Sequence, residues 1–125
     1  MKPRELPGLT VTVTQVVHAA DLEGPPGKPH VFVYFITIAN NSDETITIKG
    51  RKWVVREANG ETLAVEGDGV VGEFPRLEPG DTFDYNSSHA VGYDAEAEGA
   101  YLGLTDTGKA VFTRIPKFHL IVPVA

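Results

Sequence analysis

The sequence predicts an all-β domain, an antiparallel β-sandwich. Runs rich in β-branched and aromatic residues are separated by Gly, Pro and Asn turn signals at intervals of roughly eight to twelve residues. No window of about eleven residues keeps a helical spacing without a Gly, Pro or β-rich interruption. The 125 residues contain no linker or repeat, so we expect a single domain over residues 1–125. Residues 1–8 are expected to be a flexible N-terminus.

The first half of the chain supplies three strands. Residues 9–17 (LTVTVTQVV) alternate apolar and threonine side chains, which is typical of a half-buried strand. Residues 21–29 carry prolines and glycines and are predicted to form a surface loop. Residues 30–39 are apolar on both faces, as in a central strand. After a turn at residues 40–44, a strand is expected over residues 45–49.

A hairpin is the strongest local prediction. Residues 51–58 and 61–66 flank Asn59-Gly60, a pair that favours a two-residue turn with positive φ at both positions. Further on, Pro79-Gly80 fits the central positions of a type II turn.

The second half is predicted to hold four short strands, over residues 82–86, 100–105, 110–115 and 118–122. Asp106-Thr107-Gly108 forms a hairpin loop between the second and third of them. The acidic segment Ser87–Glu98 lies between the first two and is expected to be the least structured part.

Charge and composition narrow the classes of function. The net charge is −6, and residues 63–125 carry ten acidic residues against four basic ones. A field of this sign argues against nucleic acid and anionic membranes as partners. The absence of cysteine excludes disulfides and thiol catalysis. No apolar run approaches the roughly 20 residues of a membrane span, and no signal peptide is apparent, so we expect a cytoplasmic protein.

Gly67, Gly69 and Gly72 form a GxGxxG frame that also contains Asp68. Such a frame binds a pyrophosphate when a helix follows it, but here Pro75 and Pro79 prevent a helix. The acidic residues of the loop also disfavour an anion. The frame is therefore interpreted first as a structural turn with an exposed tip, with Gly67, Asp68, Gly69 and Gly72 as candidate ligand-binding or partner-binding residues.

Neither a metal centre nor an active site is predicted. The four histidines, His18, His30, His89 and His119, lie in separate segments without an HxH or HxxxH pair. No GxSxG motif is present, and Ser87-Ser88-His89 are adjacent residues, which rarely have triad geometry. We therefore expect a protein without enzymatic activity and without a cofactor.

Arg51 and Trp53 form one face of a basic and aromatic cluster. Tryptophan at this place is most simply a core residue. The alternative is that Arg51 and Trp53 contact a partner, because both residue types are favoured at binding hot spots.

The order GRxW, NG and VxGxGVVGExPxLxPGxxFxY over residues 50–85 resembles the ApaG family, as does the ending PxFxLxVP at residues 116–123. The resemblance implies a fibronectin-III-like or immunoglobulin-like sandwich. The family occurs as small bacterial proteins and as a domain of larger eukaryotic proteins, and it has been linked with cobalt and magnesium tolerance. Segment Ser87–Glu98 departs from the family pattern.

Three hypotheses of function follow. The first is a non-enzymatic, regulatory module that binds a protein partner through loops near the GxGxxG turn or through an exposed sheet edge, which would also allow a homodimer. The second is nucleotide or pyrophosphate binding at the GxGxxG loop. The third is weak binding of a divalent cation by acidic loops.

Overall fold

The computed structural model describes residues 2–124, and within that range the chain consists of strands and connecting loops. Met1 and Ala125, the outer limits of the predicted domain, lie outside the described residues. No helix in the described range is long and apolar enough to cross a membrane. The strands are β1 (Arg4–Glu5), β2 (Leu9–Glu23), β3 (His30–Asn40), β4 (Ile46–Glu57), β5 (Thr62–Asp68), β6 (Arg76–Leu77), β7 (Thr82–Val91), β8 (Ala95–Thr105) and β9 (Ala110–Leu120).

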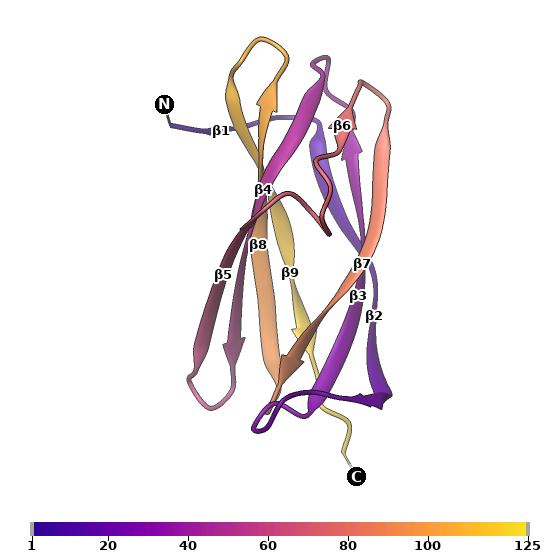
Figure 1. The fold of residues 1–125 in the computed structure, drawn as a ribbon, viewed down its shortest axis with the longest axis vertical. Helices are drawn as coiled ribbons and strands as arrows, with labels where there is room; N and C mark the ends of the chain where they lie inside the picture. The colour runs from indigo at the N-terminus through magenta and orange to yellow at the C-terminus, as the bar shows by residue number, and fades with distance from the viewer. Residues whose placement is uncertain (1, 125) are drawn as a thin grey trace.

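The strands form two facing sheets, which confirms the predicted sandwich (Figure 1). The larger sheet has the order β1-β9-β8-β4-β5, with β6 also paired to β4, and the smaller sheet has the order β2-β3-β7. The short β1 pairs in parallel with β9, and the other pairings between these strands are antiparallel. β1 falls within residues 1–8, whose flexibility stays a prediction.

Period-two alternation builds the core between the sheets. On β3 every second residue is buried, because the inner face of a pleated strand receives alternate side chains. Burying one such large apolar side chain contributes roughly 1.5–3 kcal/mol. The largest fully buried side chains are Tyr101, Ile36, Ile38, Ile46, Ile48, Leu120, Val70, Val91 and Asn40.

Two predicted pairs of strands are each one continuous strand. The predicted strands at residues 45–49 and 51–58 join as β4, because the register with β8 shifts between Ile48 and Gly50 and absorbs one extra residue. The predicted strands at residues 110–115 and 118–122 join as β9 in the same way. There the shift lies opposite Ala97–Gly99, and it accommodates Pro116, which has no N–H for a regular ladder.

The prediction that Ser87–Glu98 is poorly structured is wrong. β7 continues to Val91 and β8 begins at Ala95, so only a short turn separates them. Glu96 and Glu98 lie on the outer face of the larger sheet, where Glu98 bonds Arg56 at 2.8 Å and Glu96 lies 3.5 Å from Lys117. β2 likewise extends to Glu23, further than predicted, so the following loop starts later.

The predicted hairpin is confirmed, but its turn differs from the prediction. β4 and β5 pair from Arg56 opposite Thr62 to Gly50 opposite Asp68. Among the turn residues only Gly60 has a positive φ, of 94°. The Gly60 N–H donates to the Glu57 carbonyl at 2.9 Å, and the Glu57 N–H donates to the Glu61 carbonyl at 2.8 Å. The connection is thus a three-residue loop with glycine in the left-handed position.

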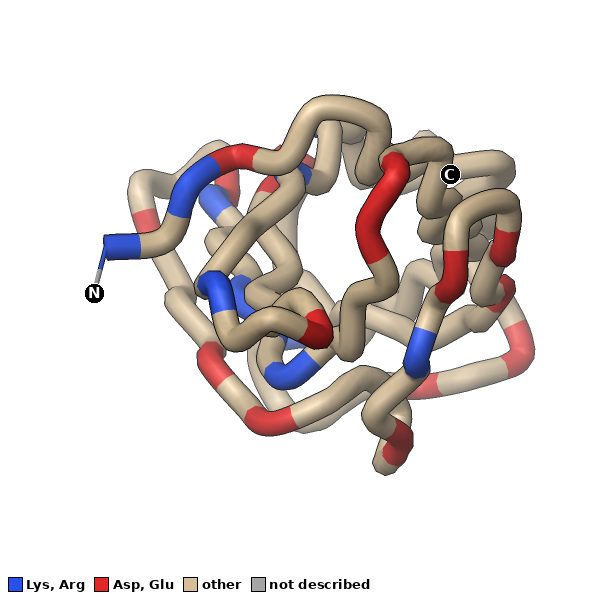
Figure 2. Tube along the Cα trace, turned by 90° about the horizontal axis from the view of Figure 1, so that it is seen from above, with Lys and Arg blue, Asp and Glu red and all other residues tan. Residues whose placement is uncertain are grey.

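Basic positions lie mainly on the side of the N-terminus, with acidic positions among them, and acidic positions predominate on the side of the C-terminus (Figure 2). Seen from above, Lys and Arg positions do not gather on one side without Asp or Glu among them (Figure 2).

Candidate functional site

The second half of the GxGxxG frame begins a segment that connects the larger sheet to the smaller one. This crossover segment, residues 69–81, leaves the end of β5, pairs briefly with β4 as β6, and then enters β7 (Figure 1). Val70 is fully buried and joins the hydrophobic core. The segment therefore covers part of the open side of the sandwich and is fixed to it by an apolar anchor.

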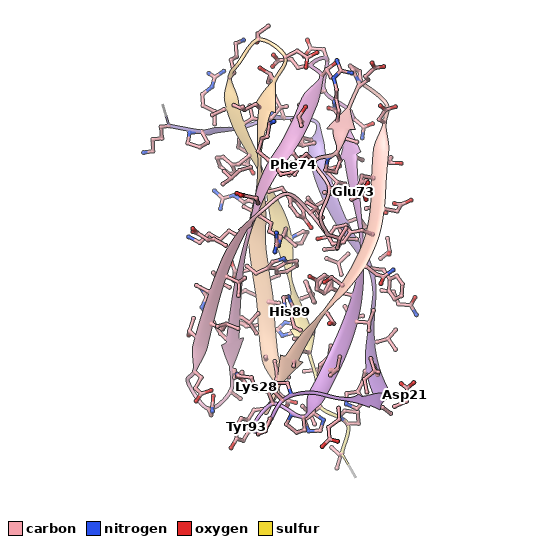
Figure 3. All side chains as sticks on the ribbon, in the orientation of Figure 1. Asp21, Lys28, Glu73, Phe74, His89 and Tyr93 are labelled. Atoms are coloured by element: carbon pink, nitrogen blue, oxygen red, sulfur yellow. The ribbon has the colours of Figure 1, made fainter. Side chains whose placement is uncertain are left out.

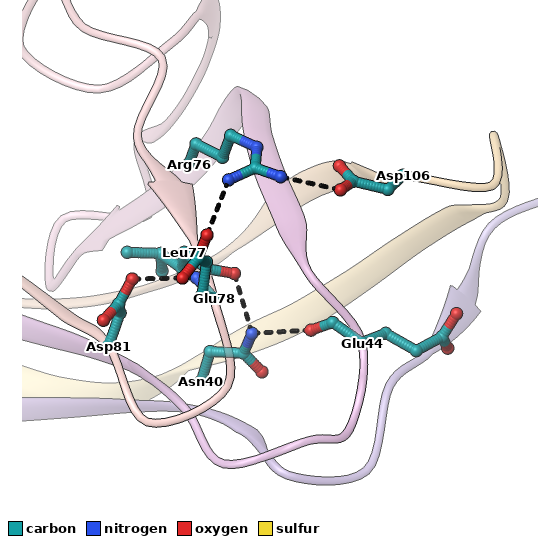
Figure 4. Close-up of polar contacts among 7 residues, drawn as sticks. All are labelled: Asn40, Glu44, Arg76, Leu77, Glu78, Asp81 and Asp106. Atoms are coloured by element: carbon teal, nitrogen blue, oxygen red, sulfur yellow. Dashed lines mark hydrogen bonds and ion pairs between the residues drawn. The ribbon is translucent and has the colours of Figure 1, made fainter.

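Polar contacts fix the far end of the crossover segment (Figure 4). Arg76 bonds Glu78 at 3.1 Å and Asp106 at 2.7 Å, which ties β6 to the β8–β9 loop. The buried Asn40 side chain donates to the carbonyl oxygens of Leu77 at 2.9 Å and Glu44 at 2.7 Å. The crossover segment is thus held to both sheets.

The predicted type II turn at the end of this segment is confirmed. Gly80 has a φ of 94°, and the Asp81 N–H donates to the Glu78 carbonyl at 2.9 Å.

The first glycine of the frame makes room for Arg51. Gly67 lies opposite Arg51 on the neighbouring strand, and a Cβ at Gly67 would approach the guanidinium to 2.7 Å. From this position Arg51 donates to the carbonyl oxygens of Asp68 at 2.8 Å and Gly69 at 3.2 Å. Gly67 and Asp68 therefore belong to β5 and not to a loop, contrary to the interpretation of the whole frame as a loop.

The second and third glycines shape a tight turn. A Cβ at Gly69 would lie 2.4 Å from the carbonyl oxygen of Glu73. Val70 and Glu73 exchange backbone hydrogen bonds of 2.8 and 2.9 Å around Val71 and Gly72, whose φ values are 44° and 80°. These angles are those of a type I′ turn, in which a β-branched residue such as Val71 is strained.

Two exposed apolar side chains stand at this turn. Val71 points to solvent at the tip, and Phe74 follows it with about half of its surface exposed. Figure 3 shows Phe74 and Glu73 where the crossover segment passes β4. The Lys49 ammonium lies 5.8 Å from the centre of the Phe74 ring. The tip thus offers an apolar contact surface.

The turn leaves few backbone donors for a phosphate. The N–H groups of Gly69, Val70 and Glu73 already bond the carbonyl oxygens of Lys49, Glu73 and Val70. The depression beside the turn, about 420 Å³ in volume, is lined by three basic residues, Lys49, Arg51 and Lys52, and by two acidic residues, Glu66 and Asp68. The two carboxylates weaken the attraction of the basic residues for an anion, and Arg51 already donates to two backbone carbonyl oxygens, so this geometry does not favour the nucleotide or pyrophosphate hypothesis.

Trp53 is a core residue. It is 3% exposed and packs against Tyr34, His89 and Phe118, with ring centres 4.7 to 5.8 Å apart. A side chain buried this deeply offers no surface to a partner, which removes Trp53 from the predicted contacts. Arg51 is half-buried, and its bonds to the β5 end give it a structural role.

His89 is the one buried side-chain nitrogen or oxygen without a hydrogen-bond partner among the described residues. Burial lowers the pKa of the imidazole to about 4, so the ring is neutral near pH 7. The preceding Ser88 points to the opposite face of β7. Ser88 and His89 therefore do not converge on a reacting atom.

Sequence reasoning missed two pairs that only the tertiary structure brings together. Lys28 bonds the buried carboxylate of Glu57, which joins two segments 29 residues apart. His18 and His30 meet with ring nitrogens 3.2 Å apart. No spacing in the sequence predicts either pair, because each pair forms only through the tertiary structure. No group of three or more His, Asp and Glu side chains in the described chain is spaced to hold a metal ion.

The comparisons with known proteins agree on one family. The model of the ApaG domain matches residues 21–102. Protein ApaG of Vibrio cholerae is 35% identical to this chain over 119 residues, which cover 94% of each protein. Protein ApaG of Xanthobacter autotrophicus is 39% identical over 107 residues, which cover 85% of this chain and 82% of that protein. The crystal structure of a putative ApaA protein from Bordetella pertussis has a TM-score of 0.85 at 27% identity and covers 98% of this chain and 100% of that one.

Proposed function

The chain belongs to the ApaG domain family, and from that premise we propose that it acts as a non-enzymatic protein-interaction module with a regulatory role. The contact surface is the free edge of β5, which accepts an extended segment of a protein partner as an additional strand. The observation that supports this proposal most is that the β5 edge has free backbone N–H and C=O groups beside the exposed side chains of Leu63 and Val65.

The register of the β4–β5 ladder identifies the free backbone groups of β5. Glu57 and Glu61 form a hydrogen-bonded pair, and antiparallel pairs alternate between bonded and non-bonded. Residues 63, 65 and 67 therefore bond β4, while residues 62, 64 and 66 direct their N–H and C=O groups away from the sheet. Unpaired groups of this kind form a template for another strand.

The β5 edge lacks several of the features that can protect a sheet edge. Residues 62–68 contain neither proline nor lysine, and their pairing with β4 has no register shift. β2 at the edge of the smaller sheet has two register irregularities, and β1 lies between Pro3 and Pro7. The remaining edge, β7, pairs with β3 without a register shift and contains neither proline nor lysine, but none of its large apolar side chains is exposed, whereas β5 exposes Leu63 and Val65. The exposed apolar side chains next to free backbone groups support pairing of β5 with another strand.

Side chains of β5 define the chemistry of the partner. Leu63 and Val65 lie on the inner face but remain 49% and 37% exposed, because the three-stranded sheet does not extend over them. Glu61, immediately before β5, and Glu66, within it, have exposed carboxylates. We therefore propose a partner strand that alternates apolar with Lys or Arg side chains. A second copy of this chain would bring like charges together, which disfavours the homodimer.

A proline at Ala64 tests this proposal. The Ala64 N–H is free, so Ala64→Pro removes an edge donor without removing a bond to β4. Capture of partners by the immobilised chain, followed by cross-linking, should recover a protein that Ala64→Pro loses. The control Leu104→Glu changes an exposed apolar residue away from the edge and should retain that protein.

If the Ala64→Pro variant still captures the protein, the β5 edge is not the contact surface. If sedimentation shows that the wild-type chain is a dimer and the Ala64→Pro variant a monomer, the strand that pairs with β5 comes from a second copy of this chain. Failure to recover any specific protein, together with measured turnover of a substrate, would refute the non-enzymatic module itself.

A further inference from the structure

Two histidines from different strands meet at the lower end of the smaller sheet, away from the β5 edge. His18 lies in β2 and His30 in β3, and His18 Nε2 is 3.2 Å from His30 Nδ1. Both rings are half-buried, with centres 5.4 Å apart and planes tilted by 44°. His18 is further held by an edge-on contact with Phe32, at 5.1 Å. The two nitrogens therefore converge in a fixed arrangement.

An irregularity of the β2–β3 ladder produces this arrangement. His18 pairs with Phe32, and the next registered pair is Glu23 with His30, so a longer stretch of β2 opposes a shorter stretch of β3. The extra residues of β2 bend away from the ladder, as at a bulge. Bulges re-aim side chains, and this one leaves a depression of about 410 Å³ whose lining includes both histidines, Asp21 and Glu23. Figure 3 shows Asp21 at the lower end of β2.

The distance between the nitrogens matches a shared metal ion. Imidazole nitrogens lie about 2.0–2.1 Å from zinc, and at a tetrahedral angle two of them are about 3.3 Å apart. A direct hydrogen bond between the rings also fits 3.2 Å, but it requires one ring to donate and the other to accept. The carboxylates of Asp21 and Glu23 in the same depression add a negative charge that attracts a cation.

We propose that His18 Nε2 and His30 Nδ1 bind a divalent transition-metal ion of the class that imidazole prefers, such as Zn²⁺, Ni²⁺ or Cu²⁺. Two protein ligands leave the remaining coordination positions to water, so the ion exchanges readily with solution. Because the neutral imidazole is the ligand, binding weakens in acid. This site is independent of the proposed partner surface.

Titration with zinc chloride, followed on the ring resonances of labelled histidine, tests the site. His18 and His30 should shift together and saturate at one ion per chain. His18→Gln and His30→Gln should each weaken binding at least tenfold, whereas His119→Gln, which removes an exposed histidine of β9, should leave it unchanged. Thermal unfolding without metal establishes that all three variants are folded.

Three outcomes would overturn the proposal. The first is no shift of His18 and His30 at millimolar zinc. The second is equal loss of binding in His119→Gln, which would indicate adsorption to any surface histidine. The third is undiminished binding in both His18→Gln and His30→Gln. With no shift on zinc addition, the 3.2 Å contact is the hydrogen bond between the two rings.

Discussion

Replacing Glu57 by glutamine removes a buried negative charge at the lower end of the sandwich, where three segments meet. The Glu57 carboxylate is 3% exposed and accepts hydrogen bonds from Lys28 and from the N–H groups of Gly92 at 2.7 Å and Tyr93 at 3.2 Å. It therefore joins the end of β4 to the loop before β3 and to the turn before β8. Figure 3 shows Lys28 and Tyr93, one from each of these two connections, at the same end of the molecule.

The expected loss is about 2 kcal/mol of unfolding free energy at pH 7 for Glu57→Gln. Breaking a fully buried ion pair costs roughly 3–5 kcal/mol, but Lys28 is 33% exposed and regains water, which reduces the cost. The glutamine oxygen still accepts from the two N–H groups, while its amide faces the lysine ammonium without attraction. Glu57→Ala, which also leaves both N–H groups without an acceptor, should lose about 3 kcal/mol.

The loss should depend on pH with a defined sign. Burial by itself raises the pKa of the Glu57 carboxyl, but the Lys28 bond and the Gly92 and Tyr93 N–H groups outweigh it and hold the pKa below the usual 4.5. A group with a depressed pKa stabilises the fold above its unfolded pKa, and this contribution disappears as pH falls through 4.5 toward the folded pKa. The difference between wild type and Glu57→Gln should therefore shrink in acid.

Urea unfolding at pH 7 and at successively lower pH measures both effects. Glu61→Gln is the matched control, because that carboxylate lies 3.7 Å from the same lysine but is exposed, and it should change stability little. The reasoning is refuted if Glu57→Gln unfolds with the wild-type free energy at pH 7, or if the difference stays constant as pH falls.

Three further predictions concern single residues. Val71→Asn, which supplies the residue preferred at the strained left-handed position, should raise the free energy of unfolding by about 1 kcal/mol in urea, and an unchanged value would show that Val71 is unstrained. Gly67→Ala should lower the free energy of unfolding by about 1–2 kcal/mol, because the new Cβ would meet the Arg51 guanidinium. The loss should be smaller in an Arg51→Ala background, and equal losses in both backgrounds would exclude this contact as the cause. Burial lowers the pKa of His89 to about 4, so as pH falls this residue takes up a proton in the unfolded chain at a higher pH than in the folded chain. The free energy of unfolding should therefore fall by up to about 3 kcal/mol from pH 6.5 to pH 4. His89→Gln should flatten this pH dependence, and a variant with the wild-type slope would contradict the prediction.

Most of the fold was predictable from local sequence. Alternation and turn residues locate β3, the β4–β5 hairpin and the type II turn at Pro79-Gly80, because each depends on neighbours in the chain. The errors arise where register shifts occur. A bulge at Lys49 keeps β4 continuous through an apparent break, and Pro116 is tolerated in β9 for the same reason. The acidic alternation at Glu96 and Glu98 belongs to a strand whose outer face pairs with basic residues of its neighbours.

Less of the candidate site was predictable. The glycines were correctly identified as positions of tight backbone, but the partner of Gly67 is the guanidinium of Arg51, 16 residues earlier, and only the register reveals it. The exposure of Leu63 and Val65 depends on the smaller sheet ending at β7, which no local pattern encodes. The contact of His18 with His30 likewise depends on a bulge.

Hydrogen exchange of the β5 amides, with and without the captured partner, tests the proposed contact most directly. In the free protein the amides of Thr62, Ala64 and Glu66 should exchange rapidly, while those of Leu63 and Val65, bonded to β4, exchange slowly. Binding of the partner should slow the first group to the rate of the second. Protection confined to the turn at residues 70–74, with unchanged exchange at residues 62, 64 and 66, would contradict strand addition at β5.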